Sequence, residues 1–230
     1  MPSSRRRAWC TALAVSGPVV FTGCWLVLGR THAGYSWRSE PVSALSAHGA
    51  AHWPWMVVGQ LAFAAGCLAL AVLARWSLAR PGLLAAAMLA LVGYGIVQAS
   101  VFRTTCKPVD ARWCPPPPPS SFPVQQWMHG VGTGIAFGGL LLACLATLWA
   151  ARRAGETSVA VVSAAAVVVS LPILAAFLES THLGWHGLAE RTFLLILSAW
   201  VVTTALLLDR WLALPQAAAV RAEARNGTLR

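Results

Sequence analysis

The sequence has few charged side chains. Asp, Glu, Lys and Arg together make up only 10% of its 230 residues, whereas soluble globular domains contain roughly 25%. Hydrophobic residues make up 57% of the chain, and the mean hydropathy is +0.64. So little charge among so many apolar residues excludes an ordinary water-soluble domain and predicts a protein whose main solvent is lipid.

Several catalytic and cofactor motifs are also missing. The sequence has no Gly-x-Ser-x-Gly elbow, no Gly-rich phosphate loop, no Cys-x-x-Cys-His haem attachment site and no His-Glu-x-x-His zinc signature. Any chemistry must therefore come from polar side chains that lie outside these motifs.

Six runs in the sequence are long and apolar enough to cross a bilayer core, which requires about 20 residues per helix. They lie at about 10–29, 55–74, 81–102, 127–151, 158–178 and 188–208. Three arginines precede the first run, as in a secretory signal, but the run has the length of a full span and no convincing cleavage site follows it. We therefore predict an all-α polytopic membrane protein with six transmembrane helices in one bundle. Its predicted parts are an N-terminus at 1–9, a transmembrane domain at 10–211 and a tail at 212–230.

Basic residues set the predicted orientation. With a cytoplasmic N-terminus, eleven of the seventeen Lys and Arg residues fall in cytoplasmic connections and tails, as the positive-inside rule requires. Both termini are therefore predicted to be cytoplasmic. The arginines are scattered beside the spans, where they can meet anionic lipid headgroups, and they form no basic face of the kind that binds nucleic acid. We expect membrane lipids as partners and no nucleic acid.

The same orientation gathers the ionisable residues on the outer side. All six histidines and four of the seven acidic residues fall in or beside the outer segments. They are His32, His48, His52, His129, His182 and His186, with Glu40, Asp110, Glu179 and Glu190. Ionisable groups at membrane depth are costly and are therefore candidates for a functional site. We predict a polar pocket that opens outward between the second outer loop, the start of the fourth helix and the segment between the fifth and sixth helices.

A metal site is one hypothesis for the stretch "STHLGWHGLAER". His182 and His186 are four residues apart, a spacing that places both on one face of a helix. With His129 or Asp110 as a third ligand, they would form a site of the kind that binds catalytic zinc. A pair of histidines at this spacing is a weak indication of a metal site. Zinc is therefore a cofactor only under this hypothesis.

Acid–base catalysis is the competing hypothesis for the same stretch. Glu179 or Glu190 could give or accept a proton near the apolar boundary. The structural alternative for Glu190 and Arg191 is that they mark the start of a helix, where a carboxylate favours the helix dipole. Serines of the first outer loop offer a nucleophile, but no elbow motif surrounds them.

The second outer loop contains two cysteines, Cys106 and Cys114, on the side of the membrane that is predicted to be oxidising. We expect them to form a disulfide, whereas the other four cysteines lie within apolar runs and are expected to be packed thiols.

Four segments of the sequence resemble a bacterial six-span family, domain of unknown function 998. They are "GYSWRSEPVSALSAHG", "VFRTTCKPVD", "WMHG" and "GLAERTFLLILSAW". The resemblance implies a six-helix fold with polar loop motifs on one side and a distant similarity to eukaryotic proteins of lipid-anchor remodelling. It implies no established reaction. The positions that match polar positions of the family are Ser36, Ser43, Cys106, Asp110, His129, Glu190 and Arg191. The run of five prolines at 115–119 departs from the family, and His182 and His186 are not part of its pattern.

The leading functional hypothesis is an enzyme of the bacterial plasma membrane that acts on a lipid or isoprenoid by acid–base or metal-assisted chemistry. A non-catalytic lipid-binding, sensory or assembly protein is the alternative, and a transporter is third. The residues assigned to the enzyme are Glu190, Asp110 and His129 as catalytic groups, and Arg191, Ser36, Ser43 and Glu179 as substrate-binding groups.

Overall fold

The computed structural model describes residues 3–78, 80–104, 122–179 and 184–227. Within these ranges the chain is helical and has no β-strand. In chain order the elements are α1 (Ser4–Thr31), the 3-10 helix η1 (Val42–Ser46), α2 (Trp53–Ser77), α3 (Gly82–Val101), α4 (Phe122–Ala154), α5 (Thr157–Glu179) and α6 (His186–Gly227).

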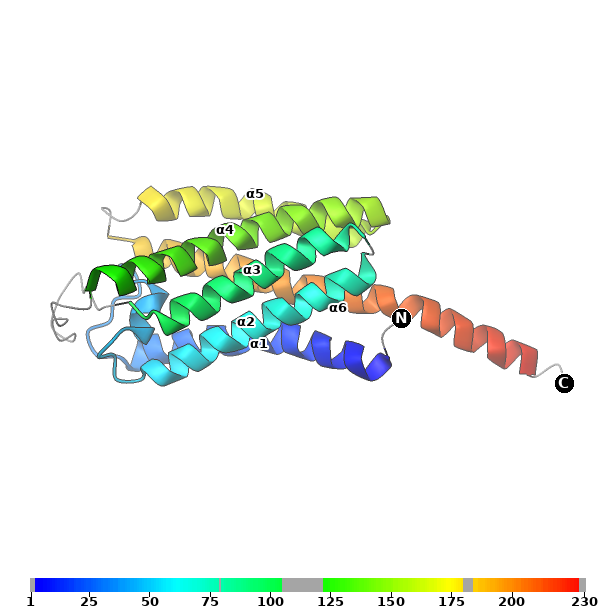
Figure 1. The fold of residues 1–230 in the computed structure, drawn as a ribbon, viewed down its shortest axis with the longest axis horizontal. Coiled ribbons are helices and arrows are strands. Elements are labelled where there is room, and N and C mark those ends of the chain that lie inside the picture. The colour runs from blue at the N-terminus through cyan, green and yellow to red at the C-terminus, as the bar shows by residue number, and fades with distance from the viewer. Residues whose placement is uncertain (1–2, 79, 105–121, 180–183, 228–230) are drawn as a thin grey trace.

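All six α-helices are long and apolar enough to cross a membrane, which confirms the predicted six-helix polytopic architecture. The apolar part of α6 ends near Ala213, but the helix continues to Gly227 and projects beyond the bundle (Figure 1). α1 begins at Ser4, ahead of the apolar run at 10–29. The Ser3 hydroxyl oxygen caps it by accepting a hydrogen bond from the Arg6 backbone N–H.

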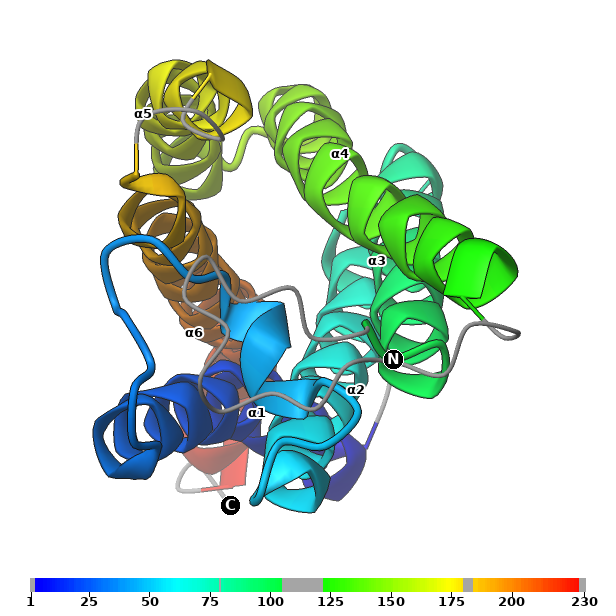
Figure 2. The same ribbon diagram turned by 90° about the vertical axis from the view of Figure 1, so that its left-hand side faces the viewer.

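The six helices form a ring in chain order, which α6 closes by contacting α1 (Figure 2). α6 also contacts α2. η1 lies inside the ring at one end of the bundle (Figure 2), and we call this end the η1 end. α1 begins and α6 ends at the opposite end (Figure 1). The chain therefore brings the end of α3 and the starts of α2, α4 and α6 together around η1.

Glycines let α3 and α4 approach closely near the η1 end. A Cβ added at Gly95 would lie 2.8 Å from the backbone oxygen of Gly132, and a Cβ at Gly132 would lie 2.7 Å from the backbone nitrogen of Ala99. Such small residues allow close helix packing in membranes. Gly130 and Gly134, on the same helix, face open space instead, so the contact with α3 depends on Gly132 alone among these three glycines of α4.

Candidate functional site

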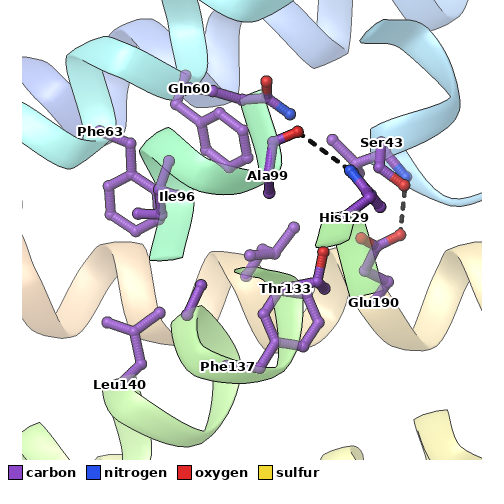
Figure 3. A pocket seen from close by; sticks show the side chains of 14 residues that line it. Ser43, Gln60, Phe63, Ile96, Ala99, His129, Thr133, Phe137, Leu140 and Glu190 are labelled. Atoms are coloured by element: carbon purple, nitrogen blue, oxygen red, sulfur yellow. Dashed lines mark hydrogen bonds between the residues drawn. The ribbon is translucent and has the colours of Figure 1, made fainter. Parts of the chain in front are cut away.

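A cavity of about 60 Å³ lies inside the ring, next to η1 (Figure 3). Residues of η1 and of every α-helix except α5 line it. Its polar residues are Ser43, Gln60, His129, Thr133 and Glu190. A cavity needs about 10–15 Å³ to hold one water, so this one has room for a few waters or for the end of a larger ligand.

The lining changes from polar to apolar along the bundle axis. On α4 the lining residues His129, Thr133, Phe137 and Leu140 follow one face of the helix away from the η1 end. Eleven residues at 1.5 Å each separate the first from the last by about 16 Å. The other helices add only apolar side chains at depth, among them Phe63. The cavity therefore has a polar mouth near η1 and a floor of aromatic and aliphatic side chains (Figure 3).

His129 is held in one orientation by the end of α3. Its Nδ1 lies 3.0 Å from the carbonyl oxygens of both Ala99 and Phe102, carbonyls that lack partners within the helix because α3 ends at Val101. Carbonyl oxygens only accept hydrogen bonds, so Nδ1 carries the hydrogen and the lone pair of a neutral ring lies on Nε2. No described residue bonds to Nε2, and the side chain is only 6% exposed. His129 thus brings a hydrogen-bond acceptor to the cavity.

Glu190 lies on the facing side of the cavity, near the start of α6. Its Oε2 accepts a hydrogen bond of 2.7 Å from the backbone N–H of Val42, the first residue of η1, whose N–H has no partner within that short helix. The side chain is 4% exposed, and its other oxygen has no partner in the described part of the chain. A buried carboxyl with a single hydrogen bond is costly unless a ligand also binds it.

Arg191 lies beside Glu190 in sequence but does not line the cavity. Its Nη1 donates to the carbonyl oxygens of Trp37 at 2.8 Å, Glu40 at 2.9 Å and Gly187 at 2.7 Å, while Nη2 bonds to the Tyr35 hydroxyl. The guanidinium also lies 5.0 Å from the ring centroid of Trp37 and 5.3 Å from that of Tyr35. Arg191 therefore fixes the loop that leads into η1, which is a positioning role.

Tyr35 completes this loop. Burial raises the pKa of its hydroxyl, so the hydroxyl stays protonated and donates to the carbonyl oxygen of Pro41 at 3.0 Å. Tyr35 and Arg191 bond to the carbonyls of Trp37, Glu40 and Pro41. The next residue of the loop, Val42, donates its backbone N–H to Glu190. The loop and α6 thus position the Ser43 side chain on the cavity.

The remaining predicted site residues lie elsewhere. Ser36 accepts a hydrogen bond from the backbone N–H of Ser39 in the loop, Glu179 is exposed at the end of α5, and His186 stacks on Phe177 with ring centroids 4.2 Å apart. Asp110, His182, Cys106 and Cys114 fall outside the described residues, so the proposed disulfide and most of the proposed zinc site stay predictions. In the described ranges no three His, Cys, Asp or Glu side chains form a group that could hold a metal.

Two polar residues of the cavity lining, Gln60 and Thr133, were not among the predicted site residues. Gln60, within the span of α2, donates to the Ser46 hydroxyl at 3.4 Å and accepts from the Ser100 hydroxyl at 3.1 Å. It joins η1, α2 and α3 at the wall of the cavity. An amide inside an apolar span is itself a signal of a functional or structural polar contact, and "VVGQLAF" contained it. Thr133 carries no comparable signal, because threonine is common in spans.

Comparison with known proteins identifies the family of this chain but no reaction that it catalyses. No curated protein and no solved structure matches the chain. One family model matches residues 15–207, a range that begins within α1, ends within α6 and includes every residue of the cavity lining. That match confirms the resemblance drawn from the sequence motifs. The chain belongs to the family described as "Protein of unknown function (DUF998)".

Proposed function

We propose that this protein is a membrane enzyme that performs acid–base chemistry on the polar end of an amphiphilic substrate, a lipid or an isoprenoid. The observation that carries the proposal is the set of side chains that line the central cavity. The His129 imidazole and the Glu190 carboxyl both line it, each keeps one polar atom without a partner among the described residues, and the floor below them is apolar. Pockets with a few convergent polar groups over apolar walls are the usual sites of small-molecule binding.

The proposed roles follow from the contacts. His129 Nε2 accepts a proton from the substrate, because Nδ1 is occupied by two carbonyls. Glu190 gives or accepts the second proton through the oxygen that Val42 does not hold. Ser43 and Gln60 hydrogen-bond the polar end. The cavity accommodates only that end and the first atoms of the apolar chain, so the rest of the chain lies among the helices or in the bilayer.

The proposal assigns the protein to a bacterial plasma membrane with the η1 end outside, and the distribution of the basic residues supports this orientation. A substrate then reaches the cavity from the outer leaflet, since the apolar chain can stay in the bilayer while the polar end enters beside η1. Membrane lipids are accordingly the expected partners.

A non-catalytic lipid-binding protein is the second candidate, and a specific observation favours it. The bonds that His129 makes to α3 and that Glu190 makes to Val42 are also ordinary ways to satisfy the ends of helices. Both residues could therefore serve to hold η1 and α3 in place around a bound lipid without any transfer of protons.

An experiment on substrate turnover tests the proposal. Purified protein in nanodiscs made from bacterial polar lipid extract is incubated, and lipid products are followed by mass spectrometry. We expect turnover that falls by about 100-fold or more in His129→Ala and Glu190→Gln, the usual scale for loss of a general acid or base. His52→Ala and Glu156→Gln, at positions outside the cavity, are the matched controls and should retain activity.

Two results would contradict the enzyme. Turnover that is equal in all four variants would remove His129 and Glu190 from the chemistry. No turnover in any form of the protein, together with a lipid that co-purifies with wild type and is lost in His129→Ala, would favour the non-catalytic candidate.

A further inference from the structure

A second group of polar side chains lies at the η1 end, outside the cavity lining. Arg103, just after α3, places its guanidinium over the ring of Trp53 at 3.7 Å from the centroid. Its Nη2 lies 3.1 Å from His48 Nδ1, and His48 Nε2 lies 2.7 Å from the side-chain amide of Gln125. We call Arg103, His48, Trp53 and Gln125 the rim cluster.

Hydrogen-bond chemistry fixes the charge of the rim cluster. A guanidinium can only donate, so His48 Nδ1 must accept and therefore carries no hydrogen. The neutral ring then has its hydrogen on Nε2. The nitrogen of the Gln125 amide lies 2.7 Å from that atom, and the amide must turn its oxygen toward the ring to accept this hydrogen. Trp53 adds no charge. The contacts within the rim cluster therefore leave the positive charge of Arg103 without a carboxylate.

Arg103 also has an unused donor. Its Nη1 is buried and has no hydrogen-bond partner in the part of the chain that the structure describes. A buried charged donor without an acceptor is costly, and the stacking on Trp53 keeps the guanidinium from turning freely toward water. A ligand that brings an anionic oxygen would satisfy this donor and neutralise the charge.

The rim cluster stands at the polar mouth of the central cavity. Arg103 follows Phe102, whose carbonyl oxygen bonds to His129 Nδ1. Gln125 precedes His129 by four residues on α4, so the two share one face of the helix and lie about one turn apart. A ligand whose polar end reaches His129 therefore extends past Arg103 at the η1 end.

The level of the rim cluster relative to the bilayer indicates which anion it meets. Trp55 and Trp127, near the starts of α2 and α4, are 65% and 66% exposed. Exposed tryptophans at the ends of spans mark the headgroup level of a membrane, where lipid phosphates lie. The planar fork of arginine matches a phosphate, which can accept two parallel hydrogen bonds.

From these contacts we propose that the rim cluster binds a phosphate group, and that the bound molecule is a phosphorylated amphiphile. The first atoms of its apolar chain enter the central cavity, and the rest of the chain lies among the helices or in the bilayer. The placement of the chain rests on the proposed function, whereas the phosphate site rests on the geometry of Arg103. Free phosphate and a lipid phosphate share this chemistry, and the probes below separate them.

Three probes test the inference on the purified full chain in a non-ionic detergent: farnesyl phosphate, farnesol and inorganic phosphate, with affinities measured by native mass spectrometry and calorimetry. We expect farnesyl phosphate to bind at least about tenfold more tightly than farnesol. Arg103→Gln should remove that advantage and leave farnesol binding unchanged, which also shows that the variant folds. Arg103→Lys keeps the charge without the fork and should lose part of the advantage. Arg30→Gln, an exposed arginine at the end of α1, is the matched control with less than about twofold change.

The outcomes separate the two proposals. Equal affinity for farnesol and farnesyl phosphate, or equal effects of Arg103→Gln and Arg30→Gln, would overturn the phosphate site while leaving an amphiphile in the cavity. A third outcome is that inorganic phosphate binds in a way that depends on Arg103 and that farnesyl phosphate binds no more tightly than inorganic phosphate. This result would support the phosphate site but contradict an amphiphilic ligand, and with it the proposed function.

Discussion

The two ends of the bundle each join α6 to the N-terminal part of the chain through an arginine, but they do so in different surroundings. At the η1 end, Arg191 is 3% exposed and donates to three backbone carbonyls and to the Tyr35 hydroxyl. At the opposite end, Arg7 Nε lies 2.9 Å from Asp209 Oδ1, with the two side chains 16% and 30% exposed. One arginine organises a loop inside the protein, and the other forms an ion pair with Asp209 at its edge.

The difference shows which end the fold holds in one conformation. A buried guanidinium with fixed acceptors is costly to disturb because each acceptor loses its partner at once. A partly exposed ion pair contributes little, because water can replace either partner. The η1 end is thus built to hold a shaped cavity, whereas the opposite end needs only to keep α1 and α6 together.

The largest expected effect comes from Arg191→Met. The substitution keeps a long apolar side chain but leaves the carbonyls of Trp37, Glu40 and Gly187 without their donor. We expect a loss of about 3–5 kcal/mol in the free energy of unfolding, the scale for removing one partner from a buried charged contact. Unfolding by sodium dodecyl sulfate in mixed micelles measures it.

Arg191→Lys is the control for charge and should be intermediate, since lysine cannot reach the same acceptors with a planar fork. If Arg191→Met costs no more than the loss of Arg7, the contrast between the two ends is wrong.

A smaller effect is expected from Gly187→Ala. A Cβ at this position would collide with the carbonyl oxygen of Glu40 and lie 2.6 Å from Arg191 Nη1, so the loop must shift. We expect a loss of about 1–3 kcal/mol, as for other overpacked sites. Gly130→Ala is the matched control in α4, where nothing lies within 4 Å of the added Cβ.

The control should be neutral or stabilising by up to about 1 kcal/mol, because alanine is the better helix former. The same micelle titration measures both variants, and equal losses at the two glycines would show that the loop is not tightly held against α6.

The smallest effect is expected from Arg7→Gln and Asp209→Asn. Each should lower the free energy of unfolding by only about 0.2–1 kcal/mol, since the pair is partly exposed and also has the Thr11 hydroxyl beside it. A double-mutant cycle at low and high salt isolates the coupling, which should shrink with salt. A coupling free energy above about 2 kcal/mol that does not change with salt would show that the arginines at the two ends are held equally strongly.

The membrane architecture could be predicted because hydrophobic length is a local property. A run of about 20 apolar residues must form a helix in lipid, whatever the rest of the chain does. The six predicted runs accordingly match the six long helices. Polar residues near the ends of those runs also pointed to His129 and Glu190, since such residues are costly in lipid and are kept where they have a partner.

The hydrogen-bond partners of individual polar side chains could not be predicted in the same way. Arg191 was predicted as a substrate-binding residue together with Ser36, and this stays a prediction. The structure adds that Arg191 binds carbonyls of the loop that contains Ser36, which the sequence did not indicate. Gln60 looked like an isolated amide in a span and proves to join η1 and α3. A side chain on a helix faces one direction only, and neighbouring positions are about 100° apart, so adjacent residues such as Glu190 and Arg191 serve different sites.

The sequence by itself determined that this chain crosses a membrane six times as helices, because the solvation of each apolar run depends only on its own residues. It also determined the family, through short motifs spread over most of the chain. The tertiary structure decided which polar residues share a cavity. Val42 and Glu190 are 148 residues apart and meet only because α6 closes the ring beside η1. Contacts of that kind follow from the packing of the whole bundle, which no single segment specifies.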